Sequence, residues 1–199
     1  MSVAARPFIV LSSLGAPVLL IGGWTVAAAH QHAGFDAITG TISALAGLGA
    51  DDRYIMTIAL YGVGVCHVLT ALGLRPARLV GRRILGAGGL FSLGVASLPL
   101  PAVGTSSAHL VAAAGAFGCL TAWPFFAYQR EPGTPLALRP SVSVAAGIVL
   151  VVLLGWLGVE LGARTHVGLA ERTAAAAQAL WPLVVSVTCV VLGSATRRR

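Results

Sequence analysis

Apolar segments about as long as a lipid bilayer is thick recur along this chain, and they constrain its fold more than any other feature. A helix needs roughly 20 apolar residues to cross the hydrocarbon core. Six segments reach or approach this length: 8–29, 54–74, 84–100, 107–128, 141–161 and 173–192. Only 10% of the residues are charged, against about 25% in soluble domains. We therefore expect an all-α membrane helix bundle with six transmembrane helices, forming a single domain over residues 1–199.

The first apolar segment also has two features of a secretory signal peptide. Arg6 precedes it, and Ala27-Ala28-Ala29 at its end is similar to a cleavage site. However, its apolar stretch is longer than the roughly 7–15 residues typical of such signals. We therefore expect a helix that is retained in the protein.

The basic residues are all arginines, and their placement indicates sidedness. Ten flank the expected helices on one side, while Arg53, Arg164 and Arg172 lie on the other. The rule that positive loops stay inside puts both termini in the cytoplasm. It also explains the net charge of +7 without a nucleic-acid partner. We expect a multi-pass protein of the cell membrane, such as the bacterial inner membrane, in contact with lipid. The ten arginines are Arg6, Arg75, Arg78, Arg82, Arg83, Arg130, Arg139, Arg197, Arg198 and Arg199.

Residues 30–53 form the longest interruption between apolar segments and would be the first outer loop. Apolar residues recur there at spacings of three and four, which predicts a short amphipathic helix. They are Phe35, Ile38, Ile42, Leu45 and Leu48. Asp51 is expected to cap the second transmembrane helix. Elsewhere, the four-residue spacing of Ala114 and Gly118 favours close helix contacts.

Most polar residues fall on the outer side of this topology, so a binding site is expected there. His109, which opens the fourth segment, could bond a ligand or titrate near neutral pH; the alternative is a solvated histidine at the interface. Ser43, His109 and Asp36 could act as nucleophile, base and orienting acid, although the chain has no GxSxG motif. Alternatively, Ser43 bonds within the loop and Asp36 is a solvated charge.

Two further candidates lie at the ends of the last two helices. Glu160 and Arg164 have the i, i+4 spacing of an intrahelical ion pair. Arg172 could hold a phosphate or a carboxylate through its planar guanidinium. The alternative is that these residues only anchor helix ends.

Histidines could also indicate a metal or haem. His30, His32, His109 and His166 are of a type that binds zinc, but no HExxH or similar pair supports such a site. His67 lies roughly 20 Å from the outer end of the second segment, without a second histidine at that depth for haem. We expect it to hydrogen-bond a neighbouring helix, and we expect no metal and no cofactor.

The segment Thr41-Ile42-Ser43-Ala44-Leu45, followed by Gly47, resembles a motif of the uncharacterised prokaryotic membrane family known as domain of unknown function nine-nine-eight. That family has about six helices and a TIS-x-L-type motif after the first. The resemblance covers most of the chain and implies the same architecture. Many members carry an acid at the position of Ala44, so the resemblance implies no catalytic acid there in this chain.

Two further features extend this resemblance. The family tends to carry a histidine near the start of a middle helix, which corresponds to His109. A Gly-x-x-x-Arg pattern before the last helix corresponds to Gly168 and Arg172. Because the family has no established activity, the resemblance points to Ser43, His109 and Arg172 without naming a reaction.

Three classes of function remain open at this stage. The first is binding of a lipid headgroup or small polar ligand at an outer-face pocket of Ser43, His109, Glu160, Arg172 and Asp36, or a role as accessory subunit of an envelope complex. The second is an intramembrane hydrolase that uses Ser43 and His109, or zinc, on lipid or amide bonds. The third is a small-molecule transporter, for which His67 is the titratable residue within a helix.

Overall fold

Helices dominate the computed structural model, which describes residues 5–32 and 34–195. No strand occurs among these residues, so the all-α class is confirmed. Two short helices and one 3-10 turn interrupt the connections: α2 (Ile42–Leu45), α6 (Pro124–Ala127) and η1 (Leu136–Leu138). The long helices are α1 (Ala5–Ala29), α3 (Tyr54–Gly73), α4 (Leu79–Ser97), α5 (Ser107–Ala122), α7 (Pro140–Ala163) and α8 (Val167–Ala195).

Five helices in the described part of the chain are long and apolar enough to cross a membrane: Pro7–Ala29, Tyr54–Gly73, Leu79–Ser97, Pro140–Ala163 and Val167–Val191. The expected fourth segment is divided instead. Its helix α5 ends at Ala122, and α6 begins at Pro124. Proline is tolerated in the first turn of a helix because the N–H that it lacks has no partner there.

Two helices begin at least five residues earlier than their apolar segments. α4 starts at Leu79 and includes Arg82 and Arg83, and α8 starts at Val167 and includes Glu171 and Arg172. Hydropathy marks where a helix can meet lipid, whereas backbone hydrogen bonding continues through charged first turns. The charged residues at these positions therefore belong to the helices and not to the connections.

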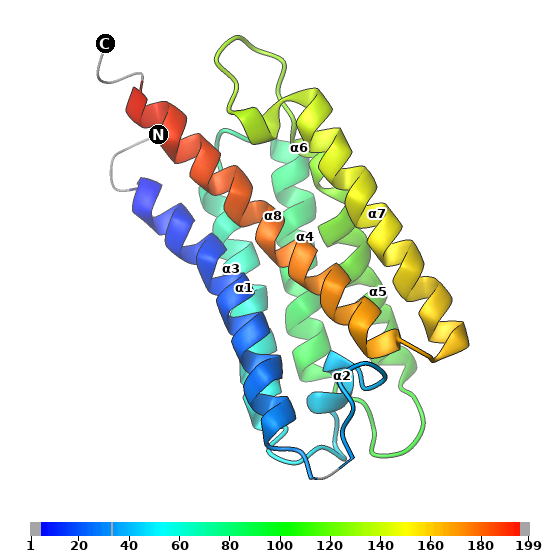
Figure 1. Ribbon diagram of the computed structural model, residues 1–199. Coiled ribbons are helices and arrows are strands. Elements are labelled where there is room, and N and C mark those ends of the chain that lie inside the picture. The colour runs from blue at the N-terminus through cyan, green and yellow to red at the C-terminus, as the bar shows by residue number, and fades with distance from the viewer. Residues whose placement is uncertain (1–4, 33, 196–199) are drawn as a thin grey trace.

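The long helices form a ring (Figure 1). Neighbours pack in the order α1, α3, α4, α5, α7 and α8, and α8 closes the ring by running obliquely against α1. Successive helices alternate in direction, and α1 begins at the end of the bundle where α8 ends. That end, which also holds connections 74–78 and 128–139, is called the arginine end. The opposite end, with residues 30–53, 98–106 and 164–166, is called the loop end.

Close backbone approach holds α3 against α4. A Cβ on Gly89 would lie 2.8 Å from the Gly64 carbonyl oxygen, and a Cβ on Gly64 would lie 2.8 Å from that of Gly89. Small residues allow such contacts between helices in lipid. Ala114 and Gly118 do not serve in this way, because both are exposed and no atom outside the local helix lies within 4 Å of a Cβ on Gly118. The prediction of a close contact there was wrong for the single chain.

The first loop contains less helix than its apolar spacing indicates. Among the described residues of this loop, only α2 is helical, and Thr41 caps it by accepting the N–H of Ala44. Ile42 and Leu45 are buried, so the amphipathic pattern is present over this one turn. Asp51 does not cap α3; the cap position is Arg53, which makes no side-chain cap bond. That prediction was wrong because Asp51 has turned toward His32.

Candidate functional site

The ring surrounds a cavity of about 70 Å³. Sites for drug-sized molecules usually have roughly 300–1,000 Å³, so this cavity has room for a few water molecules or a short ligand. Its wall comes from α1, α3, α4, α5 and α8, with α2 at the loop end. Most of the lining is apolar, including Leu60, Val63 and Phe117. The polar lining residues are Ser43, His67, Ser92, Glu171 and Gln178.

Glu171 links the last helix to the first loop where α2 meets the cavity. Its side chain is buried, with 7% of the residue exposed. One carboxylate oxygen accepts the backbone N–H of Ile42, and the other accepts the hydroxyl of Ser43 at 3.1 Å. The carboxylate therefore satisfies two donors at the beginning of α2, where backbone N–H groups lack helical partners. Ser43 is held by an acid and not by a histidine.

Arg172 holds the part of the loop that precedes α2. Its Nη1 donates to the carbonyl oxygens of Ala37 at 2.8 Å, Gly40 at 2.6 Å and Gly168 at 3.0 Å. Its Nη2 is buried and has no partner. Gly168 is needed for this contact, because a Cβ there would lie 2.7 Å from the Ala37 carbonyl oxygen. The Gly-x-x-x-Arg pattern thus clamps the loop backbone to α8.

Asp36 shapes the turn before α2. Its carboxylate accepts the N–H of Ile38 at 2.9 Å and the hydroxyl of Thr39 at 3.0 Å. These bonds favour the charged form and lower the pKa of Asp36, and the positive charge of Arg172 adds a smaller effect. Asp36 therefore supports the loop from which Ser43 extends and makes no bond to Ser43 itself.

His109 lies apart from this cluster. It is buried, with 3% exposed, and its Nδ1 lies 2.7 Å from the carbonyl oxygen of Leu98. Since a carbonyl only accepts, Nδ1 carries the proton. The backbone N–H of His109 also donates to the Ser106 hydroxyl at 3.3 Å. His109 is therefore neither a solvated histidine nor a partner of Ser43; it fastens the end of α4 to the start of α5.

Glu160 closes the turn from α7 to α8. Its Oε2 accepts the hydroxyl of Thr165 at 2.9 Å and the N–H of His166 at 2.7 Å. Arg164 follows the end of α7 in a left-handed conformation, with φ of 58°. The predicted intrahelical pair of Glu160 and Arg164 was wrong, because the helix ends before it reaches Arg164.

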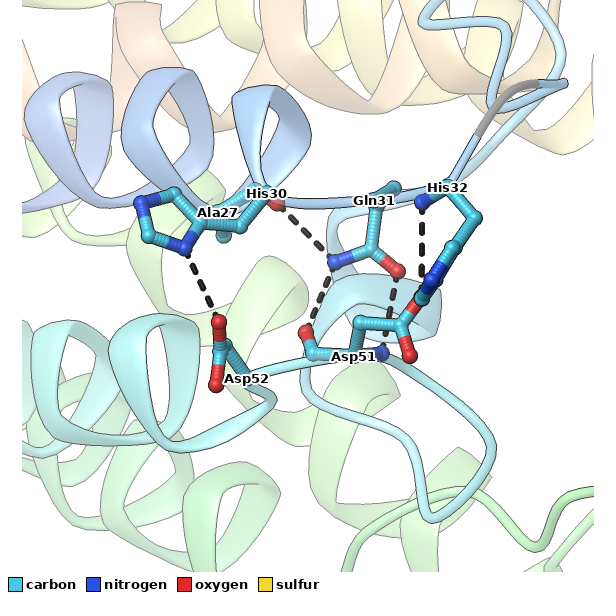
Figure 2. A network of polar contacts seen from close by, with 6 residues as sticks. All are labelled: Ala27, His30, Gln31, His32, Asp51 and Asp52. Atoms are coloured by element: carbon cyan, nitrogen blue, oxygen red, sulfur yellow. Dashed lines mark hydrogen bonds and ion pairs between the residues drawn. The ribbon is translucent and has the colours of Figure 1, made fainter.

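The base of the first loop is a polar network between the end of α1 and the start of α3 (Figure 2). The Gln31 amide exchanges two hydrogen bonds with the backbone of Asp51, at 2.8 and 3.1 Å. His30 lies 2.9 Å from Asp52, and His32 bonds Asp51. The His32–Asp51 pair raises the pKa of the imidazole and lowers that of the carboxyl.

The predicted residues therefore separate into different neighbourhoods. Ser43, Asp36 and Arg172 gather around the start of α2, whereas His109 and Glu160 each stabilise a different turn. The proposed group of Ser43, His109 and Asp36 shares no hydrogen bond. The four candidate zinc ligands have separate partners, and the described residues contain no group of three side chains suited to a metal. These four are His30, His32, His109 and His166.

Sequence reasoning missed Glu171 and Gln178 as lining residues. Gln178 donates to the Thr121 hydroxyl at 2.8 Å and the Phe117 carbonyl oxygen at 3.1 Å. His67 was expected to hydrogen-bond a neighbouring helix, yet its Nε2 is buried without a hydrogen-bond partner among the described residues. These residues could have been found from their polarity, because polar side chains inside apolar helices are costly in lipid and often functional.

The fold and cavity define a class of protein: a helical bundle with several helices of membrane-spanning length around a mainly apolar chamber. The chain belongs to the family described as protein of unknown function DUF998, whose sequence model matches residues 13–188. This match confirms the resemblance seen in the sequence. No curated protein and no solved structure matches the chain.

Proposed function

We propose that this protein crosses the cell membrane six times, with both termini in the cytoplasm and the loop end outside. Five helices of spanning length support the proposal, and α5 with α6 would make the sixth crossing. Charge supports the sidedness: Arg75, Arg78, Arg82 and Arg83 lie around the connection from α3 to α4 at the arginine end. Positive residues in short connections favour the cytoplasmic side.

Within this bundle, we propose that the cavity binds a small amphipathic ligand with a short apolar chain. The observation that carries the proposal is an apolar chamber whose polar groups are concentrated on a few side chains, with Glu171 and Ser43 next to α2. Apolar walls accommodate a hydrocarbon chain, and a few placed polar groups fix its orientation. Compared with the five-residue pocket expected from the sequence, this site retains Ser43 and adds Glu171 and His67.

The carboxylate of Glu171 favours a headgroup that donates hydrogen bonds. Its oxygens already accept from Ile42 and Ser43, and an ionised carboxylate has further acceptor capacity. A hydroxyl or ammonium group would match it, whereas a second carboxylate would be repelled. Deeper in the wall, the unpartnered Nε2 of His67 provides another polar contact.

Thermal unfolding in lipid nanodiscs tests this proposal. We expect butylamine and butanol to raise the apparent melting temperature more than butanoate does, because bound ligand stabilises the folded state. Ala113 lines the cavity, and its neighbour Ala114 is exposed. Ala113→Leu should remove the stabilisation by filling the chamber, whereas Ala114→Leu should retain it.

In the same assay, the Glu171→Gln variant tests whether the preference for a headgroup depends on the charge of Glu171. The amide can accept from Ile42 and donate to Ser43, so the loop should stay in place while the negative charge is lost. The preference for butylamine over butanoate should then disappear. Equal stabilisation of the wild type by all three compounds, or full stabilisation of Ala113→Leu, would refute ligand binding in this cavity.

A hydrolase acting on lipid or amide bonds remains the second candidate, and the contact between Ser43 and Glu171 favours it. A carboxylate that accepts a serine hydroxyl proton can act as a general base. Because His109 bonds Leu98, the base in this proposal is Glu171. Labelling by a fluorophosphonate that disappears in Ser43→Ala would support it, and the absence of labelling in wild-type protein would argue against it.

The transporter hypothesis and the accessory-subunit hypothesis have less support. His67 lines the cavity between membrane-length helices, which is where a proton-coupled carrier would place a titratable group. Proton-coupled uptake by liposomes that contain the wild-type protein, and its loss when they contain His67→Ala, would support a transporter. Co-purification of a stoichiometric membrane partner would support an accessory role.

A further inference from the structure

A groove lies on the surface of the bundle between α3 and α4, near the arginine end. It has a volume of about 400 Å³. Two arginines, Arg82 and Arg83, belong to its lining. The other lining residues are Val68, Ala71, Leu72, Leu79, Gly86, Ala87 and Leu90.

The groove is hollow because its floor is built from small residues. Gly86 has only the Ala71 side chain nearby, 3.5 Å from where its Cβ would be. The rim is formed by leucines that point outward: Leu72 is 65% exposed and Leu90 is 61% exposed. In a membrane-spanning bundle these side chains face lipid, so an acyl chain can lie along the apolar groove.

The two arginines at its end have different surroundings. Arg82 donates from Nε to the Ala71 carbonyl oxygen at 2.8 Å and from Nη2 to that of Leu72 at 2.7 Å. These carbonyls belong to the last turn of α3, where helical partners are missing. Arg83 is exposed, and its side chain makes no hydrogen bond or ion pair with the described residues. One guanidinium is thus fixed at the groove, and the next is free to bind.

Charge around the groove is strongly positive. Arg75 and Arg78 lie in the short connection that precedes α4. At the arginine end of the described chain, the acidic side chain is Glu131, which is exposed and accepts the N–H of Arg130. The groove therefore combines an apolar wall with an excess of positive charge at one end.

We infer that this groove binds an anionic phospholipid. Its phosphate would lie on Arg83 beside Arg82, and one acyl chain would lie along the leucines toward Leu90. A guanidinium fork matches phosphate oxygens, and basic pockets between transmembrane helices bind anionic headgroups. This inference requires that the bundle lies in a bilayer, and it is independent of any ligand in the internal cavity.

Native mass spectrometry of the purified protein tests the site, with phosphatidylglycerol and phosphatidylcholine of equal chain length as probes. We expect phosphatidylglycerol to bind at the lower concentration. Arg83→Gln should weaken it about fivefold, which corresponds to about 1 kcal/mol for one arginine near a lipid surface. Arg139→Gln removes the same charge at the same end of the bundle but outside the groove, so its affinity should equal that of the wild type.

Filling the groove provides the second arm of this experiment. Gly86→Leu should weaken binding of phosphatidylglycerol and phosphatidylcholine alike, since both use the acyl-chain channel. If Gly86→Leu does not yield folded protein, Ala87→Leu fills the same groove. Three results would overturn the inference: equal binding of the two lipids by the wild type, equal losses in Arg83→Gln and Arg139→Gln, or unchanged binding in the groove-filling variants.

Discussion

Two adjacent residues, Glu171 and Arg172, determine how the first loop is held. The helix directs them to different parts of the loop: the carboxylate bonds Ile42 and Ser43, and the guanidinium bonds the backbone of Ala37 and Gly40. The sequence pointed to Ser43 and Arg172 as polar residues on one side of the membrane. It did not reveal that Glu171 joins them, because this contact spans 128 residues of chain.

Replacing Glu171 should show how much this contact stabilises the fold. We expect Glu171→Ala to lower the free energy of unfolding by about 2 kcal/mol, because buried donors of the loop lose their acceptor. Glu171→Gln should cost less than about 1 kcal/mol, since an amide can bond both groups. Unfolding in detergent measures both, with the exposed Glu131→Ala as control. An equal loss of unfolding free energy in Glu171→Ala and Glu171→Gln would contradict the proposed hydrogen bonds to Ile42 and Ser43.

The pair of His32 and Asp51 should make stability depend on pH. The pKa of His32 is raised, so its contribution is complete below about pH 6.5 and is lost as the pH rises through the raised value. The pKa of Asp51 is lowered, so its contribution is present above about pH 3.9 and is lost as the pH falls. Between pH 6 and pH 9, the wild type should therefore lose more stability than His32→Gln.

Melting temperatures of the two proteins across this pH range provide the measurement. The comparison with His32→Gln removes the contributions of other titrating groups, which both proteins share. Parallel curves would show that the pair does not contribute to stability.

At the scale of helices, apolar length predicted most elements but not their limits. The segments expected at 54–74 and 141–161 correspond closely to α3 and α7. α4 and α8 extend beyond their apolar segments through charged turns, and Pro124 divides the fourth. Hydropathy indicates whether a helix can be surrounded by lipid. Helix ends depend on backbone bonds and caps, such as that of Thr41, which composition does not show.

The glycine contact between α3 and α4 gives a prediction for this pair of helices. Gly89→Ala should destabilise the protein by about 1–3 kcal/mol, because the added Cβ would lie 2.8 Å from the Gly64 carbonyl oxygen and the backbone must shift. Gly118→Ala adds the same atom in open space on α5 and should be neutral or slightly stabilising. Chemical unfolding of both variants checks this, and similar stabilities would contradict tight packing at Gly89.

For the whole molecule, the sequence predicted a bundle but not its interior. The cavity is formed by helices α1, α3, α4, α5 and α8, so no single segment indicates it. His67, Ser92 and Gln178 come from three of these helices and share a chamber only after the ring closes. Such convergence depends on helix rotation and packing order, which are set by contacts like that of Gly64 with Gly89.

The proposed topology can be tested by labelling single cysteines in intact cells. Val103, 90% exposed in the connection before α5, lies at the loop end, and Glu131 lies at the arginine end. A membrane-impermeant maleimide should label Val103→Cys and leave Glu131→Cys unlabelled until the cells are opened. The unmodified chain controls for the native cysteines Cys66, Cys119 and Cys189, none of which is exposed. The reverse pattern would invert the sidedness.

The bond between Ile42 and Glu171 has a consequence for how the protein is made. Its partners are 129 residues apart, and ribosomes add about 5–20 residues per second. The first loop therefore waits roughly 6–25 s after its own synthesis before the acid that fastens it emerges. Under the proposed topology, the nascent bundle would lack its final wall throughout that interval, and its centre would be open to the surrounding lipid. Insertion of the last helix would then close this side of the bundle.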